Sequence, residues 1–272
     1  MKKSLWNAAP FSLWMLLFTL APLGLVVYYA FTDANGAYTW HNILALGTHL
    51  STFWYSIVIG MISTLICLVL AYPLAYGISR GSERVQQTMI MLVMLPMWMN
   101  FLLRTYAWQP LLEPNGLFNR LFGLVGLGPF QMLNTHGAVV MGMVYNYLPF
   151  MILPLYSVMV KIDSRTIEAA QDLGGGFFQV IRRVVLPLSL PGIVSGITMV
   201  FVPAVSTFAL TKLLGGDKKA MIGDVIESMF NGQTLNHHVG SALSLVLMIL
   251  ILLCMAVVGM VDKDEDTGGF MG

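Results

Sequence analysis

The chain has little charge, few cysteines and no phosphate-binding loop, and each of these absences excludes a class of protein. Only 10% of its 272 residues are Asp, Glu, Lys or Arg, and 57% are hydrophobic. Soluble domains carry about 25% charged residues, so a water-soluble fold is excluded. The net charge of +1 argues against a nucleic-acid partner. The two cysteines, Cys67 and Cys254, both lie inside apolar runs and indicate no redox role.

Motifs for catalysis are absent as well. The sequence contains no Gly-x-x-x-x-Gly-Lys-Ser/Thr loop, nor even one Gly-Lys pair, so it lacks the usual cradle for ATP. Its five histidines show no metal-ligand spacing, and no paired carboxylates or nucleophile cluster occur within its apolar runs. We therefore expect no catalytic residues, no metal site and no cofactor. Any ATP that drives its work must be bound by a partner subunit.

What the sequence does contain is long runs without Asp, Glu, Lys or Arg. A span needs about 20 apolar residues, and a charge at the bilayer centre costs roughly 2.5–3.5 kcal/mol. The third run stops at residue 103, and we extend its span to about Trp108, with Arg104 near the outer interface. The pattern predicts one all-α, polytopic membrane domain over residues 1–272, with six transmembrane helices at about 10–32, 53–79, 88–108, 137–160, 184–211 and 239–261.

The distribution of basic residues predicts the orientation. With the N-terminus inside, the cytoplasmic segments hold nine of the 14 Lys and Arg residues and the external loops hold five. This bias is the one that the positive-inside rule prefers. We therefore expect a multi-pass protein with both termini cytoplasmic. The loop at 161–186 is then cytoplasmic, and the loops at 33–52, 104–136 and 212–238 are external.

The loop at 161–186 carries a spaced motif. Glu168-Ala169-Ala170 is followed by Gly174 and, after Val184, by Leu186-Pro187. A helix cap at Asp163 or Ser164 predicts a helix that the glycines at 174–176 end, and a second helix begins near Phe177. The two small alanines would allow a partner to approach the backbone closely. From the residues alone, an amphipathic loop lying on the membrane surface is an equal alternative.

This spacing resembles the EAA signature of the membrane subunits of ABC importers. The resemblance implies the type I ABC importer permease fold, with a short cytoplasmic coupling helix that docks on an ATPase subunit. The residues that it assigns to coupling are Glu168, Ala169, Ala170, Gly174, Leu186 and Pro187. Glu168 is then a candidate partner for a basic residue of the ATPase.

Prolines interrupt several of the spans, and polar and aromatic residues gather beside them. Broken backbone in a span is tolerated where it lines a cavity or packs against protein. We therefore predict a translocation pathway lined by Trp98, Asn100, Tyr106, Tyr145, Asn146 and Tyr147. The alternative for the aromatic members is an interfacial belt, which is common in membrane proteins.

Three further stretches, 95–106, 148–156 and 222–226, resemble the first permease subunit of bacterial spermidine/putrescine ABC importers. This resemblance implies a location in the bacterial inner membrane and four kinds of partner: a second, different permease, two copies of an ATP-binding subunit, an external polyamine-binding protein and membrane lipid. The chain departs from the family at its acidic end, Asp262 to Asp266, where a basic tail would be usual.

The solute itself is not fixed by charge. The predicted external loops hold five acidic and five basic residues, so they do not select a cation. Permeases for sulfate, molybdate, iron or phosphate share the coupling motif and remain alternatives. A passive channel or a membrane scaffold is the rival from another class, in which the motif spacing would be coincidental.

Overall fold

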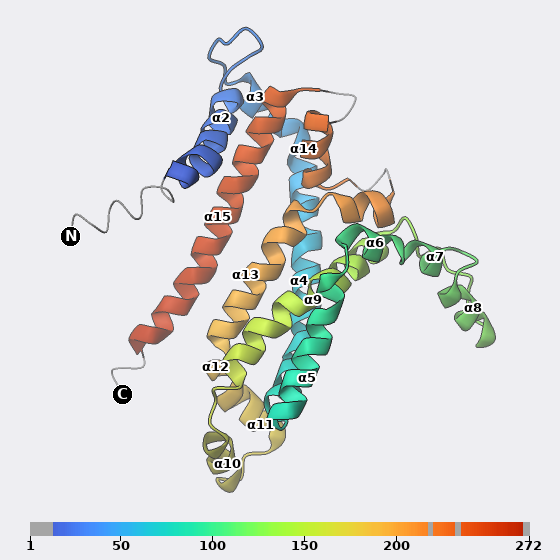
Figure 1. The fold of residues 1–272 in the computed structure, drawn as a ribbon, viewed down its shortest axis with the longest axis vertical. Helices are drawn as coiled ribbons and strands as arrows, with labels where there is room; N and C mark the ends of the chain where they lie inside the picture. The colour runs from blue at the N-terminus through green and yellow to red at the C-terminus, as the bar shows by residue number, and fades with distance from the viewer. Residues whose placement is uncertain (1–12, 217–219, 232–234, 269–272) are drawn as a thin grey trace.

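The computed structural model describes residues 13–216, 220–231 and 235–268, and within them the chain is almost entirely helical (Figure 1). The helices are η1 (Leu16–Leu20), α2 (Ala21–Ala30), α3 (His41–Leu44), η2 (Ala45–His49), α4 (Leu50–Ser79), α5 (Glu83–Met94), η3 (Leu95–Trp98), α6 (Phe101–Tyr106), α7 (Gln109–Leu112), α8 (Leu117–Leu124), α9 (His136–Met159), α10 (Ser164–Asp172), α11 (Phe177–Val180), η4 (Ile181–Val185), α12 (Leu186–Leu188), α13 (Leu190–Ser206), η5 (Thr211–Gly215), α14 (Ile222–Asn231) and α15 (His237–Gly268).

Three long helices, α4, α9 and α13, pack on one another and form the centre of the molecule (Figure 1). The bounds of α4 and α9 lie close to the segments expected at 53–79 and 137–160. The buried residues between them are apolar, with Met143, Met151 and Leu155 of α9 fully enclosed. In lipid no hydrophobic effect drives helices together, so such contacts must rest on close packing.

Small residues allow this close packing. A Cβ atom added at Gly196 of α13 would lie 2.6 Å from Sδ of Met151 in α9. One added at Gly60 of α4 would lie 2.7 Å from Cγ2 of Val205 in α13. Both distances are shorter than real Cβ contacts, so glycine is required where the helices cross.

The third apolar segment does not continue straight to Trp108, as the sequence suggested. The chain breaks after η3, and the part from Phe101 to Leu124 lies at 93° to the part from Glu83 to Trp98. Pro96 lacks an N–H for the helix ladder, and Asn100 caps a new helix by accepting hydrogen bonds from the amides of Leu102 and Leu103 at 2.9 and 3.3 Å. The helices α6, α7 and α8 therefore form an arm that leaves the bundle (Figure 1).

The fifth apolar segment is broken as well. Helices Phe177–Leu188 and Leu190–Ser206 meet at Ser189 with a bend of 70°. Residues 184–188, which the sequence analysis placed inside the span, thus belong to the approach to α13. The long helix also ends at Ser206, short of the expected residue 211. Pro187 and Pro191 flank the bend, and proline disrupts the ladder at both positions.

The remaining apolar helices, α2 and α15, pack against each other beside the bundle (Figure 1). Four helical segments of the described chain are long and apolar enough to cross a membrane: Leu13–Ala30, His41–Ser79, His136–Met159 and His237–Val257. The number becomes six if each bent pair counts as one span. The expected count of six therefore remains a prediction that depends on the two broken segments.

The two ends of the molecule are distinct. The α10–α11 hairpin (residues 164–180) lies at one end, and α3 and α14 lie at the other (Figure 1). This arrangement separates the 161–186 loop from the loops 33–52 and 212–238, as the predicted topology requires.

Candidate functional site

The α10–α11 hairpin begins at a capped helix. The side chain of Asp163 accepts a hydrogen bond from the amide of Arg165 at 3.0 Å, which satisfies a donor that the first turn of α10 leaves free. The expected cap at Asp163 or Ser164 is thus confirmed as Asp163. The helix that carries Glu168, Ala169 and Ala170 begins at Ser164 as a result.

Glycine ends α10. Gly174 has φ of +85°, a left-handed conformation that residues with a Cβ rarely adopt. The amide of the next residue, Gly175, donates to the carbonyl of Ala170 at 3.1 Å and closes the helix end. The chain then turns into α11 at Phe177, so the helix end and the second helix that the sequence predicted are both confirmed.

A small cluster of buried apolar residues stabilises the hairpin. Ile162, Ile167, Val180 and Val185 are buried together, and Ala170 packs against them. Ala170 is therefore half-buried and faces the hairpin itself, whereas Glu168 and Ala169 are exposed. The two alanines, which the sequence treated alike, occupy different environments.

The tip of the hairpin exposes large apolar side chains. Leu173 is 91% exposed and Phe178 is 85% exposed, and Phe177 beside them also projects from the surface. Phe177 is held in place by an edge-on contact with Tyr76 of α4, with ring centroids 6.2 Å apart. Large exposed apolar groups that cluster on a rigid turn are typical of a protein–protein contact.

Arg80 anchors the base of the hairpin. Its guanidinium donates to the carbonyl of Met159 at 2.6 Å and to that of Ile162 at 3.0 Å. Met159 is the last residue of α9 and Ile162 lies in the turn after it, so Arg80 ties α4 to the start of the hairpin loop. Positive-inside counting used Arg80 only as a charge. Its structural role had no signal in the sequence, because its partners lie about 80 residues further along the chain.

Leu186 and Pro187 form the short helix α12 on the far side of the hairpin, where both are exposed. They lie at the bend into α13 rather than at the tip with Leu173 and Phe178. The structure thus places Glu168, Ala169 and Gly174 on or beside the exposed hairpin, and it places the Leu-Pro pair at its junction with the bundle.

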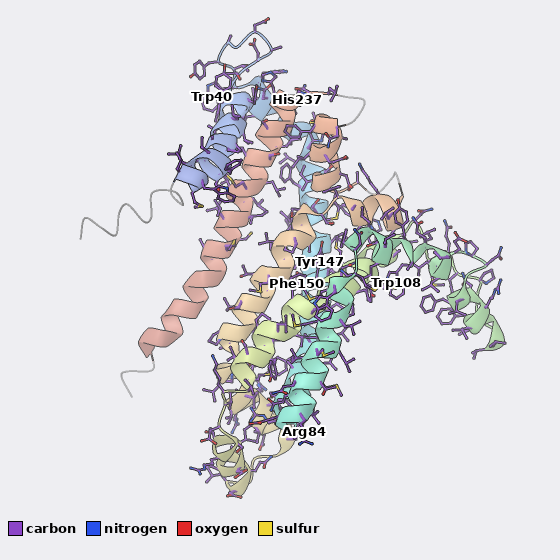
Figure 2. The ribbon with its side chains drawn as sticks, in the orientation of Figure 1. Trp40, Arg84, Trp108, Tyr147, Phe150 and His237 are labelled. Carbon is purple, nitrogen blue, oxygen red and sulfur yellow. The ribbon has the colours of Figure 1, made fainter. Side chains whose placement is uncertain are left out.

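Of the six predicted pathway residues, Asn146 and Tyr147 are buried. Figure 2 labels Tyr147 on α9. The Asn146 amide donates to the carbonyl of Gly142 at 2.8 Å, and its Oδ1 has no partner among the described residues. The Tyr147 hydroxyl donates to the carbonyl of Pro203 in α13 at 3.4 Å. Tyr147 thus bonds to the backbone carbonyl of the proline in the neighbouring helix.

The other four pathway residues have different environments from this pair. Tyr145 makes an edge-on contact with Trp108 at 5.2 Å between ring centroids. Trp98 is 74% exposed and Tyr106 is half exposed. Asn100 is engaged as the cap of α6. The role of these six residues in a translocation pathway therefore stays a prediction.

Arg104, which the sequence analysis placed near the outer interface, is buried within the protein. It is only 7% exposed, and its guanidinium donates to the carbonyl of Pro96 at 2.8 Å. The guanidinium also lies over the ring of Tyr145, 5.6 Å from the centroid. Arg104 therefore stabilises the break in the third segment by occupying the carbonyl that the bend frees.

Buried polar groups hold α14 at the opposite end of the molecule. The hydroxyl of Ser56 in α4 accepts a hydrogen bond from the amide of Ile222 at 2.8 Å. Asp224 accepts from the amide of Met221 at 2.6 Å and from the hydroxyl of Thr211 at 2.5 Å. Burial raises the pKa of the Asp224 carboxyl, against the opposing effect of these two donors. The sequence marked this helix only as an amphipathic one.

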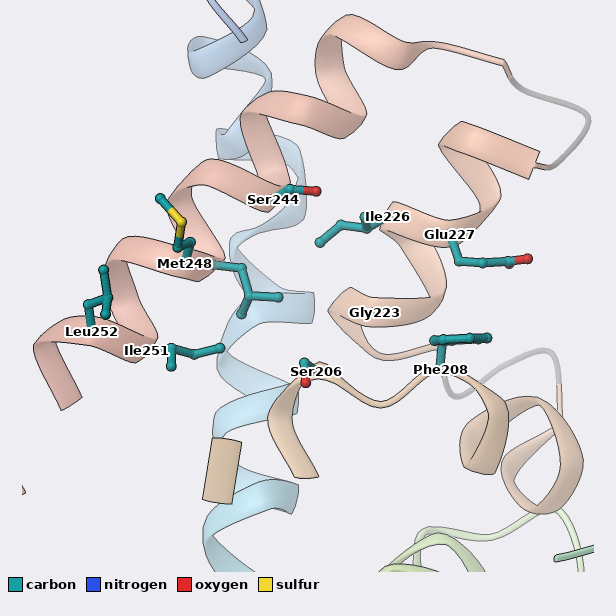
Figure 3. Close-up of a pocket in the computed structure, with 10 residues that line it drawn as sticks. Ser206, Phe208, Gly223, Ile226, Glu227, Ser244, Met248, Ile251 and Leu252 are labelled. Atoms are coloured by element: carbon teal, nitrogen blue, oxygen red, sulfur yellow. The ribbon is translucent and has the colours of Figure 1, made fainter. Parts of the chain in front are cut away.

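A groove of about 430 Å³ separates α14 from α15 (Figure 3). Ile226 of α14 faces Ser244 and Met248 of α15 across it, and Ser206 lies at its floor (Figure 3). Its lining is almost entirely apolar. Within the described residues, no group of three His, Cys, Asp or Glu side chains is placed to hold a metal ion.

Comparisons with known proteins give a family. Residues 69–264 match the model of the binding-protein-dependent transport system inner membrane component. The spermidine/putrescine transport system permease protein PotB of Haemophilus influenzae is 38% identical over 250 residues, which are 88% of this chain and 87% of that protein. PotB of Escherichia coli is 34% identical over 227 residues, 80% of this chain and 82% of that protein.

A solved structure shares the fold. A chain of the bacterial alginate ABC transporter in complex with an alginate pentasaccharide-bound periplasmic protein superposes with a TM-score of 0.79 at 15% identity. The match covers 97% of this chain and 96% of that chain. It supports the all-α membrane architecture described above.

Proposed function

The chain belongs to the family of binding-protein-dependent transport system inner membrane components, and we propose that it is the permease subunit of an ATP-driven importer for spermidine and putrescine. The family makes it a multi-pass membrane protein of a transport system and not an enzyme. The solute is carried over from the PotB relatives, which are named for these two polyamines.

The observation that carries the coupling role is the exposed tip of the α10–α11 hairpin. A rigid, capped hairpin that displays Leu173 and Phe178 at one end of the bundle is suited to insert into a groove of another protein. We assign Glu168, Ala169 and Gly174 to this contact with an ATP-binding subunit. Ala170, Leu186 and Pro187 support it by shaping the hairpin and its junction with α13.

The assembly follows from the single hairpin. One permease offers one docking point, whereas a closing pair of ATPases presents two. The complete transporter then contains a second, different permease, two ATP-binding subunits and an external polyamine-binding protein. ATP is bound only by the ATPases, and their closure moves the hairpins together and rocks the two permeases about a central site.

The orientation in the inner membrane places the hairpin and both termini in the cytoplasm and α14 outside. The translocation pathway lies between the two permeases in this arrangement. Trp98, Asn100, Tyr106, Tyr145, Asn146 and Tyr147 remain its candidate lining from this subunit, and Trp98 and Tyr106 already project from the isolated chain.

The test is transport by the reconstituted four-component complex in proteoliposomes. Internal ATP should drive uptake of radiolabelled spermidine and putrescine when the binding protein is outside, and both solutes should stimulate ATP hydrolysis. Sulfate, molybdate, ferric iron and phosphate serve as competing solutes. Uptake of one of these in place of polyamines would refute the assigned solute, and ATP-independent flux through the chain alone would indicate a passive channel.

A further inference from the structure

The carboxyl group of Asp224 has one oxygen that the fold does not use. Asp224 is 5% exposed, and its Oδ2 receives both hydrogen bonds described above, from Thr211 and from the amide of Met221. Its Oδ1 is inaccessible to solvent and has no hydrogen-bond partner among the described residues. A buried carboxylate oxygen left without a donor is costly, so this oxygen calls for a ligand.

That side chain lines a small pocket of about 200 Å³ between η5 and α14. The hydroxyl of Ser228 and the side chain of Lys212 border the same pocket. The Ser228 hydroxyl donates to the carbonyl of Val225, so its oxygen is free to accept a hydrogen bond. The pocket therefore offers acceptors on two sides and room for a group the size of an ammonium ion.

Lys212, which borders this pocket, takes part in the only ion pair among the described residues. The ammonium group of Lys212 contacts Oε2 of Glu227, one turn beyond Asp224 on α14. Both side chains are partly exposed, at 51% and 27%, so the pair can open without disrupting the core. With the carboxylates of Asp224 and Glu227 and the ammonium group of Lys212, these three side chains together carry a net charge of −1 when all are ionised.

We propose that Asp224 and Glu227 form an acceptance site for a primary ammonium group of the transported amine, and that Lys212 occupies it when no amine is bound. The ammonium group of lysine is chemically the same as the end of a polyamine. An arriving amine can therefore replace Lys212 at Glu227 and occupy the adjoining pocket that the Asp224 side chain lines. The site rests on the proposed polyamine function and gives it a residue-level basis.

Other ligands fit this pocket less well. Calcium takes six to eight oxygen ligands at 2.3–2.6 Å, and the described residues here supply far fewer. An anion would be repelled by two carboxylates. An ammonium group brings three N–H donors to acceptors that lack them, which matches the unpaired oxygen of Asp224.

The proposed site also explains how a cationic solute could be selected. Summed over the external loops, acidic and basic residues balance. At the α14 pocket acidic groups outnumber basic ones locally. Asp224 is buried there, and Glu227 is paired with a lysine that an amine can replace. Selection of a cation then depends on two carboxylates in one place and not on the overall charge.

The test compares the Michaelis constants for spermidine uptake of the reconstituted complex containing four single variants. Glu227→Gln and Asp224→Asn each remove one acceptor charge, and we expect each to raise KM by about ten-fold or more, the effect of losing one charged hydrogen bond. Lys212→Met removes the resident competitor, and we expect KM to fall below the wild-type value. Glu113→Gln, an external carboxylate away from this pocket, is the matched control and should leave KM unchanged.

The decisive result is that KM changes in opposite directions, falling in Lys212→Met and rising in Glu227→Gln. If the ion pair only holds η5 against α14, both substitutions break it equally and shift KM in the same direction, which would overturn the proposal. Unchanged KM in all variants would overturn it too. If Asp224→Asn fails to assemble, the Lys212 and Glu227 variants still decide.

The wild-type complex is assayed first, so that the two hypotheses are separated. A wild-type complex that carries neither spermidine nor putrescine refutes the proposed function. Normal wild-type uptake with no response in the variants refutes only the acceptance site.

Discussion

The two ends of this molecule are built on opposite principles. At the α10–α11 hairpin the backbone is fixed internally, and large apolar side chains such as Phe178 are left in solvent. At the α14 end polar side chains such as Asp224 and Ser56 are buried and accept hydrogen bonds from backbone amides. In the proposed function the first end binds another protein, and the second end uses its buried polar groups to receive a polar ligand.

This difference predicts where substitutions will act. Changes at the hairpin tip should affect association with a partner and leave the chain intact. Changes at the α14 end should affect the chain itself or its handling of solute.

The largest effect is expected from Phe178→Ala. An exposed aromatic residue that anchors an interface typically contributes about 2 kcal/mol, which is roughly a thirty-fold change in affinity. The variant should bind the ATP-binding subunit that much more weakly in detergent, as measured by a titration with the purified ATPase. Phe130→Ala, on an external segment, is the control, since that residue is also exposed. Equal affinity in the wild type and Phe178→Ala would remove the tip from the interface.

Ala169 and Ala170 allow an exposed and a half-buried residue of the same motif to be compared. Ala169→Asp places a charge on the exposed side of α10, so ATPase binding and uptake should be weakened while the thermal stability of the subunit is unchanged. Ala170→Asp places the charge against the buried cluster of Ile167 and Val180, so the subunit itself should lose stability. A thermal-shift measurement on both purified variants distinguishes these outcomes. Identical melting of the two would show that the alanines do not differ in environment.

The two ends of the molecule differ in how much of their structure could be predicted from the sequence. The cap at Asp163, the turn at Gly174 and the start of α11 follow from local rules, because capping and left-handed turns depend on residues a few positions apart. The helices α4 and α9 were equally predictable from their uncharged runs. Local signals of this kind needed no knowledge of the tertiary structure.

The features that sequence reasoning missed depend on distant partners. The sequence showed Arg104 only as a charge near the end of a span, and it did not indicate that the carbonyl of Pro96 accepts a hydrogen bond from its guanidinium. Arg80 bonds to the end of α9, and Ser56 receives the amide of Ile222 across 166 positions. Each of these pairings arises only when helices far apart in the sequence come together.

A smaller effect is expected from Ser56→Ala at the α14 end. The substitution removes the acceptor for the buried amide of Ile222, and a buried donor left unpaired costs about 1–3 kcal/mol. Thermal unfolding of the purified subunit should occur at lower temperature, and ATPase affinity should stay at the wild-type value. Ser157→Ala is the control, because its hydroxyl bonds only within α9 and is exposed. A loss of ATPase affinity in Ser56→Ala would mean that the two ends are not independent.

The smallest effect is expected from a single proton on Asp224. Burial raises its pKa in the folded chain above the usual value of 3.8, so the folded state binds the proton more tightly than the unfolded state does. Stability therefore falls as the pH rises from 3.8 through the raised pKa, and it is constant with respect to this group above that point. In Asp224→Asn this contribution is absent. The difference in melting temperature between wild type and variant, measured from pH 4 upward, should shift in favour of the variant as the pH rises. Glu113→Gln should show no such trend. If the difference in melting temperature stays constant, or moves in favour of the wild type, ionising the Asp224 carboxyl costs no stability. The α14 end would then resemble the hairpin, whose charged groups are in contact with solvent.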